Sequence, residues 1–317
     1  MAEQLETLPD ARFRHEALLY AGENEFVDGC TSFIRAGLEA DEPTLVVARG
    51  EKLERLREAL GGDADHIQLA DMADVGRNPA RIIPAWQEFV DEHAEPGVRL
   101  RGIGEPVFPE RDVHELVECE RHEALLNLAF AGADRFWLLC PYDTEALPAE
   151  VIAEARRNHP FVACGEHREL SADYLGSEAL SEPFAAELPE PPAEAPELRF
   201  EAAGLEAVRR LVFEQALAAG LSRGRAVEHV VAVNEIATNS LEHGGGAGVL
   251  RMWLEERRLV SEIRDSGSLA DPLADRRLPD PDDAAGRGFW LANRLCDLVQ
   301  VRSFPGELVV RLHVSAR

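Results

Sequence analysis

The first half of the chain alternates between two hydrophobic spacings. Continuous apolar runs bounded by polar or turn residues predict buried strands. Apolar residues at helical spacing between 24 and 40, and again over 113–132, predict two helices. Strand–helix alternation of this kind predicts a mainly parallel α/β sheet. The runs that predict strands are HEALLYAG (15–22), PTLVVARG (43–50), VRLRGIGE (98–105) and RFWLLCPYD (135–143).

One hexapeptide, RHEALL, occurs twice, at Arg14–Leu19 and at Arg121–Leu126. The flanking residues do not match, so the two copies do not indicate an internal repeat. The surrounding spacing predicts a strand for the first copy and a helix for the second.

A proline-rich segment, SEPFAAELPEPPAEAPEL (181–198), separates the two halves of the chain. Five prolines among Ala and Glu exclude a helix interior or a central strand, so the segment predicts an extended, semi-rigid linker. We therefore expect a domain over 1–176, a linker over 177–197 and a second domain over 198–317.

The second domain has a different order of elements. A short strand (197–202) precedes helices over 205–220 and 225–244, which end at Gly220 and Gly244. Next come a hairpin (248–256 and 257–267), a Pro/Asp-rich segment, a third helix (289–297) and two strands (298–304 and 307–316). Helices with a run of antiparallel strands predict an α+β sandwich.

Composition narrows the classes of function. The chain carries 59 acidic against 33 basic residues, a net charge of −26, which argues against binding to nucleic acid or to an anionic membrane. The sequence has no signal-peptide pattern and no apolar run of the ~20 residues that a membrane span needs. Its five cysteines form no CxxC pair, which is typical of a reduced, cytoplasmic protein with buried thiols.

The helix expected over 225–244 contains the stretch NEIATNSLEHG, with Glu235 and Asn239 one turn apart. A solvated polar face is the ordinary interpretation of this helix taken alone. A helical projection places Val227, Val230, Val231, Val233, Ala237 and Leu241 on one side, and Glu228, Glu235, Asn239, Glu242 and His243 on the other.

Two short motifs follow. RDSG places Asp265 and Gly267 at the end of a predicted strand, and GRG places Gly286, Arg287 and Gly288 before a predicted helix. Glycines ahead of a helix N-terminus let a phosphate approach free backbone N–H groups, although each motif alone is usually only a turn.

The order and spacing of these motifs resemble the GHKL ATPase family, whose domain is the two-layer α+β Bergerat fold. Residues 198–317 look most like the anti-sigma factor serine/threonine kinases. The resemblance implies that Asn239 binds Mg²⁺ on the phosphates of ATP and that Glu235 orients or deprotonates the attacking group. It further implies that Asp265 accepts a hydrogen bond from adenine beside Gly267, that Gly286, Arg287 and Gly288 line the phosphates, and that 269–285 form a lid.

The sequence departs from this family at two positions: Leu269 replaces the second glycine of DxGxG, and Phe289 replaces an aliphatic residue. It also has no separate helical hairpin with a phospho-accepting histidine, because His229 lies inside the nucleotide-site helix. We therefore expect a protein kinase that phosphorylates an anti-sigma antagonist of STAS type. An ATP-dependent module that sequesters a sigma factor without turnover, and a histidine kinase-like protein, are the alternatives. A homodimer is compatible with each.

The first domain resembles the MEDS sensory domain, named for methanogens, methylotrophs and a dichloromethane regulator. HEALLYAG, GEPVFPER, ERHEALLN, LLCPYDTEALP and ARRNHP carry the resemblance. It implies a degenerate RecA/KaiC-like sheet that senses an unknown small ligand, and the absence of GxxxxGK[ST] argues against ATP binding there. The candidate ligand-binding residues at strand ends or on the matching helix are Glu105, Glu123, Asn127, Tyr142 and Asp143.

The helix over 113–132 also carries Glu115, Cys119 and His122 at a spacing that one helix face could use for three metal ligands. Neighbouring surface and core residues on a long helix are the favoured interpretation of these three.

Overall fold

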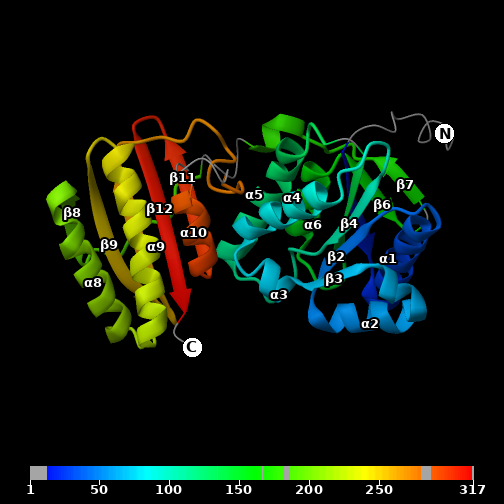
Figure 1. Cartoon of the computed structure of the whole chain (residues 1–317), viewed down its shortest axis with the longest axis horizontal. Helices are drawn as coiled ribbons and strands as arrows, with labels where there is room; N and C mark the ends of the chain where they lie inside the picture. Colours follow the sequence, from blue (N-terminus) through cyan, green and yellow to red (C-terminus); the bar gives the residue numbers. More distant parts are fainter. Residues whose placement is uncertain (1–12, 134, 166, 181–185, 280–286, 316–317) are drawn as a thin grey trace. The chain divides into compact units, whose positions relative to one another are not determined.

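The computed structural model describes residues 13–133, 135–165, 167–180, 186–279 and 287–315. The chain divides into two compact units, Met1–Pro183 and Phe184–Arg317, each with its own sheet (Figure 1). In the described parts of the chain, no helix has the length and apolar composition that a membrane span requires.

Unit 1 contains a seven-stranded sheet in the order β3-β2-β4-β5-β1-β6-β7. All strand pairs are parallel except β6–β7, so the mainly parallel sheet predicted from the sequence is observed, with one antiparallel edge strand. The strands are β1 (Arg14–Tyr20), β2 (Thr44–Ala48), β3 (Gln68–Asp71), β4 (Leu100–Gly104), β5 (Phe136–Asp143), β6 (Phe161–Cys164) and β7 (His167–Leu170).

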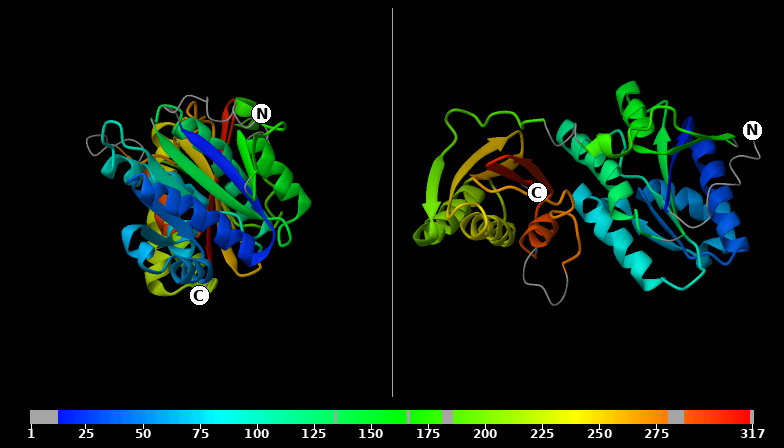
Figure 2. Two further views of the ribbon diagram at one scale, coloured as in Figure 1. Left: turned by 90° about the vertical axis from the view of Figure 1, so that its right-hand side faces the viewer. Right: turned by 90° about the horizontal axis from the view of Figure 1, so that it is seen from above.

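Helices cover both faces of this sheet, with α1 and α2 on one face and α4, α5 and α6 on the other (Figures 1 and 2). The helices are α1 (Gly22–Glu39), α2 (Gly50–Leu60), α3 (Met72–Val75), α4 (Ile82–Glu92), α5 (Val113–Ala129) and α6 (Ala149–Asn158), with 3-10 turns at Gly61–His66, Pro79–Arg81 and Gly176–Leu180.

The side chains of β1 are buried on both faces of the sheet, which accounts for the long apolar run in its sequence. Leu18 and Tyr20 pack with Phe26 of α1, whereas His15 points in the other direction, toward Glu123 of α5. Because both faces of the sheet are covered, side chains on both sides of the strand are buried.

Unit 2 contains a five-stranded antiparallel sheet in the order β11-β12-β10-β9-β8, with three helices on one face (Figure 2). This is the α+β arrangement expected from the sequence. Its elements are β8 (Glu197–Glu201), a 3-10 turn (Ala202–Gly204), α8 (Leu205–Ala218), α9 (Arg223–Glu242), β9 (Ala247–Glu255), β10 (Arg258–Asp265), α10 (Arg287–Leu295), β11 (Leu298–Phe304) and β12 (Glu307–Ser315).

The prediction that the valine-rich side of α9 is buried is partly wrong. Val227 and Val231 are 50% and 37% exposed, and with Phe213 of α8 they line a shallow apolar groove. Because α9 contacts α8 and α10 as well as the sheet, its buried stripe is rotated toward small residues that allow close packing. The buried residues of α9 are Ala226, His229, Ala232, Val233, Ile236, Ala237 and Ser240.

The end of α9 also differs from the prediction. The helix ends at Glu242, and the left-handed conformations that follow it belong to Gly245 and Gly246, with φ of 88° and 85°. Gly244 is needed for a different reason, because a Cβ there would lie 2.4 Å from the Asp265 carboxyl carbon.

The proline-rich segment is attached to unit 2 over its described part. The Arg311 guanidinium donates a hydrogen bond to the Pro189 carbonyl, and the Met252 amide donates to the Pro196 carbonyl over 3.2 Å. Pro189 and Glu190 therefore lie against the face of the sheet that the three helices leave uncovered, whereas Pro196 extends the pairing of β8 with β9.

Candidate functional site

Helix α9 brings Glu235 and Asn239 to one turn spacing, and both side chains are half-buried. Among the described residues, neither side chain has a hydrogen-bond or ion-pair partner. A carboxylate and an amide in this condition have free acceptor oxygens for a ligand.

The start of α10 lies directly against Asn239. A Cβ added to Gly288 would come within 2.9 Å of Asn239 Nδ2 and within 3.3 Å of Oδ1. Two segments about fifty residues apart in the sequence thus meet through a glycine that leaves room for the amide.

Asp265, the last residue of β10, is held in place by hydrogen bonds. Its Oδ2 accepts from the Ser240 hydroxyl of α9 over 2.6 Å, and its Oδ1 accepts from the Gly267 amide over 2.7 Å. The neighbouring Ser266 hydroxyl donates to the Gly244 carbonyl over 2.9 Å. The C-terminal end of α9 and the DSG turn therefore form one hydrogen-bonded corner, with Ser240 next to Asn239 in the helix.

The GRG motif is described only in part. Gly286 and residues 280–285 of the expected lid lie outside the described residues. Arg287 is exposed at the first position of α10. Of the earlier lid residues, Leu269 donates its amide to Ser303 Oγ over 2.8 Å, and the Asp275 carbonyl accepts from the Asn293 side chain over 2.6 Å.

The two departures from the family pattern both contact the core of unit 2. Phe289 is 6% exposed and belongs to the apolar cluster beneath the sheet, and Leu269 packs against that cluster. The larger side chains at these positions are thus accommodated by packing.

A cavity of about 770 Å³ lies near the end of β10, and Asp265 and Ser266 contribute to its wall. Its other lining residues come from the strand ends and from β8, and they include none of Glu235, Asn239 and Gly288. The cavity therefore borders the corner at Asp265 and Ser266 and does not extend to Glu235, Asn239 and Gly288.

His229 is buried in the same helix, with its Nε2 2.8 Å from the Ser261 hydroxyl. Burial, together with repulsion from Arg225, lowers the pKa of His229 to about 3. A neutral imidazole enclosed by the core has no access to a phosphoryl donor, which fits the prediction that His229 is not a phospho-acceptor.

The described residues fit Mg–ATP. Each Asp265 oxygen accepts one hydrogen bond from the protein, and a carboxylate has about four lone-pair sites, so acceptor capacity remains for a further donor. Asn239 offers an amide oxygen beside the start of α10, and the first turn of a helix favours anions.

Two family models match the chain, one within each of its two units. Residues 14–160 match the family described as MEDS, MEthanogen/methylotroph, DcmR Sensory domain. Residues 198–314 match the family described as histidine kinase-like ATPase domain. None of the curated proteins compared with the chain matches it.

Solved structures also match part of the chain, among them the following two. One contains the RsbU and RsbW domains of a Mycobacterium tuberculosis protein, at 17% identity and a TM-score of 0.29, and the match covers 38% of this chain and 32% of that one. The other is the histidine kinase AdeS of Acinetobacter baumannii, at 11% identity and a TM-score of 0.23, covering 38% of this chain and 68% of that one. The matched region is thus about a third of the first structure's length.

The antiparallel sheet and helices of unit 2, together with the family match, fit the GHKL class of α+β ATPase domains. More particularly, the chain consists of a MEDS domain followed by a histidine kinase-like ATPase domain. This combination supports an ATPase- or kinase-like regulatory protein, and a GHKL-type domain implies ATP binding.

Proposed function

We propose that the protein is a cytoplasmic serine/threonine kinase of the anti-sigma type. Unit 2 binds Mg–ATP and phosphorylates a small STAS-type antagonist protein, and unit 1, a degenerate RecA/KaiC-like domain over 1–176, regulates this activity through the 177–197 linker. The observation that carries the proposal is the corner in which Asn239 lies against Gly288 while its neighbour Ser240 is bonded to Asp265.

Each residue has one role in this proposal. Asn239 Oδ1 binds the metal, and the backbone N–H groups of Gly286, Arg287 and Gly288 bind phosphate oxygens at the start of α10. Glu235 orients the substrate hydroxyl and accepts its proton. Asp265 accepts a hydrogen bond from the adenine amino group, and Gly267 lets the base lie close.

When bound, Mg–ATP supplies the phosphoryl group and the metal charge that offsets its negative oxygens. The protein contributes mainly position, because phosphoryl transfer requires little covalent chemistry from side chains. The acidic composition fits a partner that is another protein better than a partner that is nucleic acid.

Glu235→Gln separates phosphoryl transfer from nucleotide binding. The substitution keeps the shape of the side chain but removes the base, so Mg–ATP affinity should persist while transfer falls by about 10²–10⁴. Asn239→Ala should instead lower Mg–ATP affinity and transfer together. The measurements are calorimetric titration with Mg–ATP and transfer of labelled phosphate to candidate antagonist proteins.

Glu228→Gln is the matched control, because Glu228 lies two turns earlier on α9 and, among the described residues, forms its ion pair with Arg225. It should change neither property. Transfer by Glu235→Gln at the wild-type rate would make Glu235 structural. If the wild-type protein transfers no phosphate yet changes its affinity for a sigma factor or antagonist when ATP binds, the protein is a nucleotide-dependent sequestering module.

A further inference from the structure

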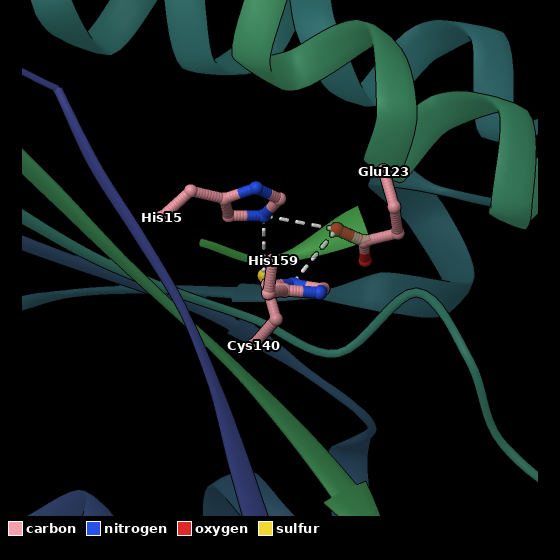
Figure 3. Close-up of side chains that lie close together, drawn as sticks. All are labelled: His15, Glu123, Cys140 and His159. Atoms are coloured by element: carbon pink, nitrogen blue, oxygen red, sulfur yellow. Dashed lines mark hydrogen bonds and ion pairs between the residues drawn. The ribbon is translucent and has the colours of Figure 1, made fainter. Parts of the chain in front are cut away.

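Unit 1 contains a buried cluster of four side chains that the ATPase function does not use. His15 comes from β1, Glu123 from α5, Cys140 from β5, and His159 follows α6 (Figure 3). Each side chain is at most 1% exposed, and their four ligand atoms lie within 4.8 Å of one another. Four elements that are distant in the sequence thus direct potential ligand atoms to one point.

The shortest separations approach those of a metal site. Glu123 Oε2 lies 3.0 Å from His15 Nε2 and 3.3 Å from His159 Nε2, and Cys140 Sγ lies 3.4 Å from His15 Nε2. Ligands at about 2.0–2.3 Å from a tetrahedral zinc ion lie roughly 3.3–3.8 Å from one another. Small side-chain rotations would convert one arrangement into the other.

Hydrogen bonds outside the cluster orient both imidazoles. His159 Nδ1 lies 2.7 Å from the Ala155 carbonyl, which can only accept, so Nδ1 carries the proton. His15 Nδ1 lies 3.2 Å from Asn127 Oδ1, and Asn127 Nδ2 donates to the Asn158 carbonyl. In their neutral form, both histidines therefore direct an Nε2 lone pair into the cluster, with the outer hydrogen bonds that metal-binding histidines have.

The interior of the cluster has more acceptors than donors. With neutral imidazoles, two Nε2 lone pairs and the Glu123 carboxylate face two donors, the Cys140 thiol and the Tyr142 hydroxyl, and both of these interact with Glu123. Among the described residues, neither His159 Nε2 nor Glu123 Oε1 has a partner within acceptable hydrogen-bond geometry. Buried acceptors without a donor are costly, and a cation between them removes this cost.

We propose that unit 1 binds one divalent transition-metal ion of the zinc class through His15 Nε2, Glu123, Cys140 Sγ and His159 Nε2. A thiolate, two imidazoles and one carboxylate oxygen suit Zn²⁺ in tetrahedral geometry. Four protein ligands complete the coordination, so the site has no open position for a substrate, unlike a catalytic zinc site. The metal would fasten strand β1 to α5, β5 and the end of α6 in the core of the sensory domain.

This cluster differs from the one considered on the helix alone. Glu115 forms a capping box with Asp112 at the start of α5, and Cys119 Sγ donates to the Pro106 carbonyl. Glu115 and Cys119, two of the three residues at metal-ligand spacing on that helix, therefore have other partners. The residue of α5 that belongs to the cluster is Glu123, which follows His122.

The test uses the full-length chain, stripped of metal with a chelator and titrated with Co²⁺. A tetrahedral cobalt spectrum with a thiolate charge-transfer band should saturate at one ion per chain, and Zn²⁺ should displace it. Cys140→Ser should abolish the charge-transfer band. Asn127→Ala, which removes the outer partner of His15 together with the hydrogen bond to the Asn158 carbonyl, should weaken Zn²⁺ binding by about 10–100-fold.

Cys164→Ser is the matched control, because Cys164 is the exposed thiol of unit 1 and lies outside the cluster. It should leave the spectrum unchanged. Circular dichroism of each variant establishes whether it is folded. The proposal is overturned if the folded wild-type chain gives no tetrahedral cobalt spectrum, or if the band disappears in Cys164→Ser and persists in Cys140→Ser. The wild-type result decides the question even if Cys140→Ser fails to fold.

Discussion

Three glycines around the motif corner allow close approach of neighbouring groups. At Gly244 and Gly267 an added Cβ would lie 2.4 Å and 2.8 Å from atoms of the Asp265 carboxylate, and at Gly288 it would lie 2.9 Å from Asn239. None of the three has a left-handed backbone, so the constraint is space. The proposed nucleotide binding therefore depends on these glycines because larger residues would displace the side chains of Asp265 and Asn239.

Gly288→Ala should reduce Mg–ATP affinity at least about tenfold, equivalent to ~1.4 kcal/mol. The methyl group would displace the Asn239 amide, whose side chain can rotate, so the fold should remain intact. Gly224→Ala is the control, because an added Cβ there would meet only Ser222 Oγ, at 4.0 Å. Calorimetric titration of both variants with Mg–ATP is the measurement. Equal Mg–ATP affinities of the two variants would show that Gly288 has no role in phosphate binding.

Asp265→Asn should weaken binding of ATP more than binding of GTP. A carboxylate accepts from the adenine amino group, whereas guanine presents a carbonyl at that position. Loss of a hydrogen bond to a charged group should cost about 1.5–3 kcal/mol for ATP. If the Kd values of both nucleotides change equally and only slightly, Asp265 does not recognise the base.

At the scale of elements, the helix-free face of the unit 2 sheet contains a buried carboxylate, Glu262, that pairs with two arginines. Glu262 of β10 accepts hydrogen bonds from Arg311 Nε and Arg264 Nε, each over 2.6 Å. Arg311 also donates to the Pro189 carbonyl, and Arg264 lies 3.7 Å from Glu190. The two arginines therefore connect the proline-rich segment to the sheet.

Arg311→Met should lower the free energy of unfolding of unit 2 by about 3 kcal/mol, because it leaves a buried carboxylate with one cation. The double variant Glu262→Gln/Arg311→Met should recover part of this loss. Arg251→Met is the control, since Arg251 pairs with Glu197 at the surface and should contribute less than about 1 kcal/mol. Urea unfolding measures all three, and an equal loss for Arg251→Met and Arg311→Met would contradict the burial argument.

At the scale of the whole molecule, the motif residues all lie within unit 2, so this unit should bind nucleotide without unit 1. A fragment over 184–317 should bind Mg–ATP with about the affinity of the full chain. A fragment over 198–317 lacks the Pro189 and Glu190 contacts and should unfold at lower denaturant concentration.

Calorimetric titration and urea unfolding of both fragments test this expectation. A folded 184–317 fragment that binds no nucleotide, together with binding by 1–183, would move the site to the other unit.

Much of the fold was predictable because hydrophobic spacing is a local property. Continuous apolar runs and the 3.6-residue spacing identified β1, β2, β4, β5, α1 and α5 of unit 1. The surrounding spacing correctly assigned RHEALL to a strand at Arg14–Leu19 and to a helix at Arg121–Leu126. The order of the glycine and acidic motifs also pointed to unit 2 as the ATPase-like part. The roles of Glu235, Asn239, Asp265 and the GRG residues remain predictions.

Only the tertiary structure decided which side chains meet. Spacing alone placed Val227 and Val231 on the buried side of α9, because a single helix does not reveal that two other helices and a sheet surround it. The pair His15 and Glu123 is separated by 108 residues, and Cys140 lies 125 residues after His15. Their convergence follows from the sheet order, which places β1 between β5 and β6. Strand order depends on packing of the whole unit, and no local pattern in the sequence encodes it.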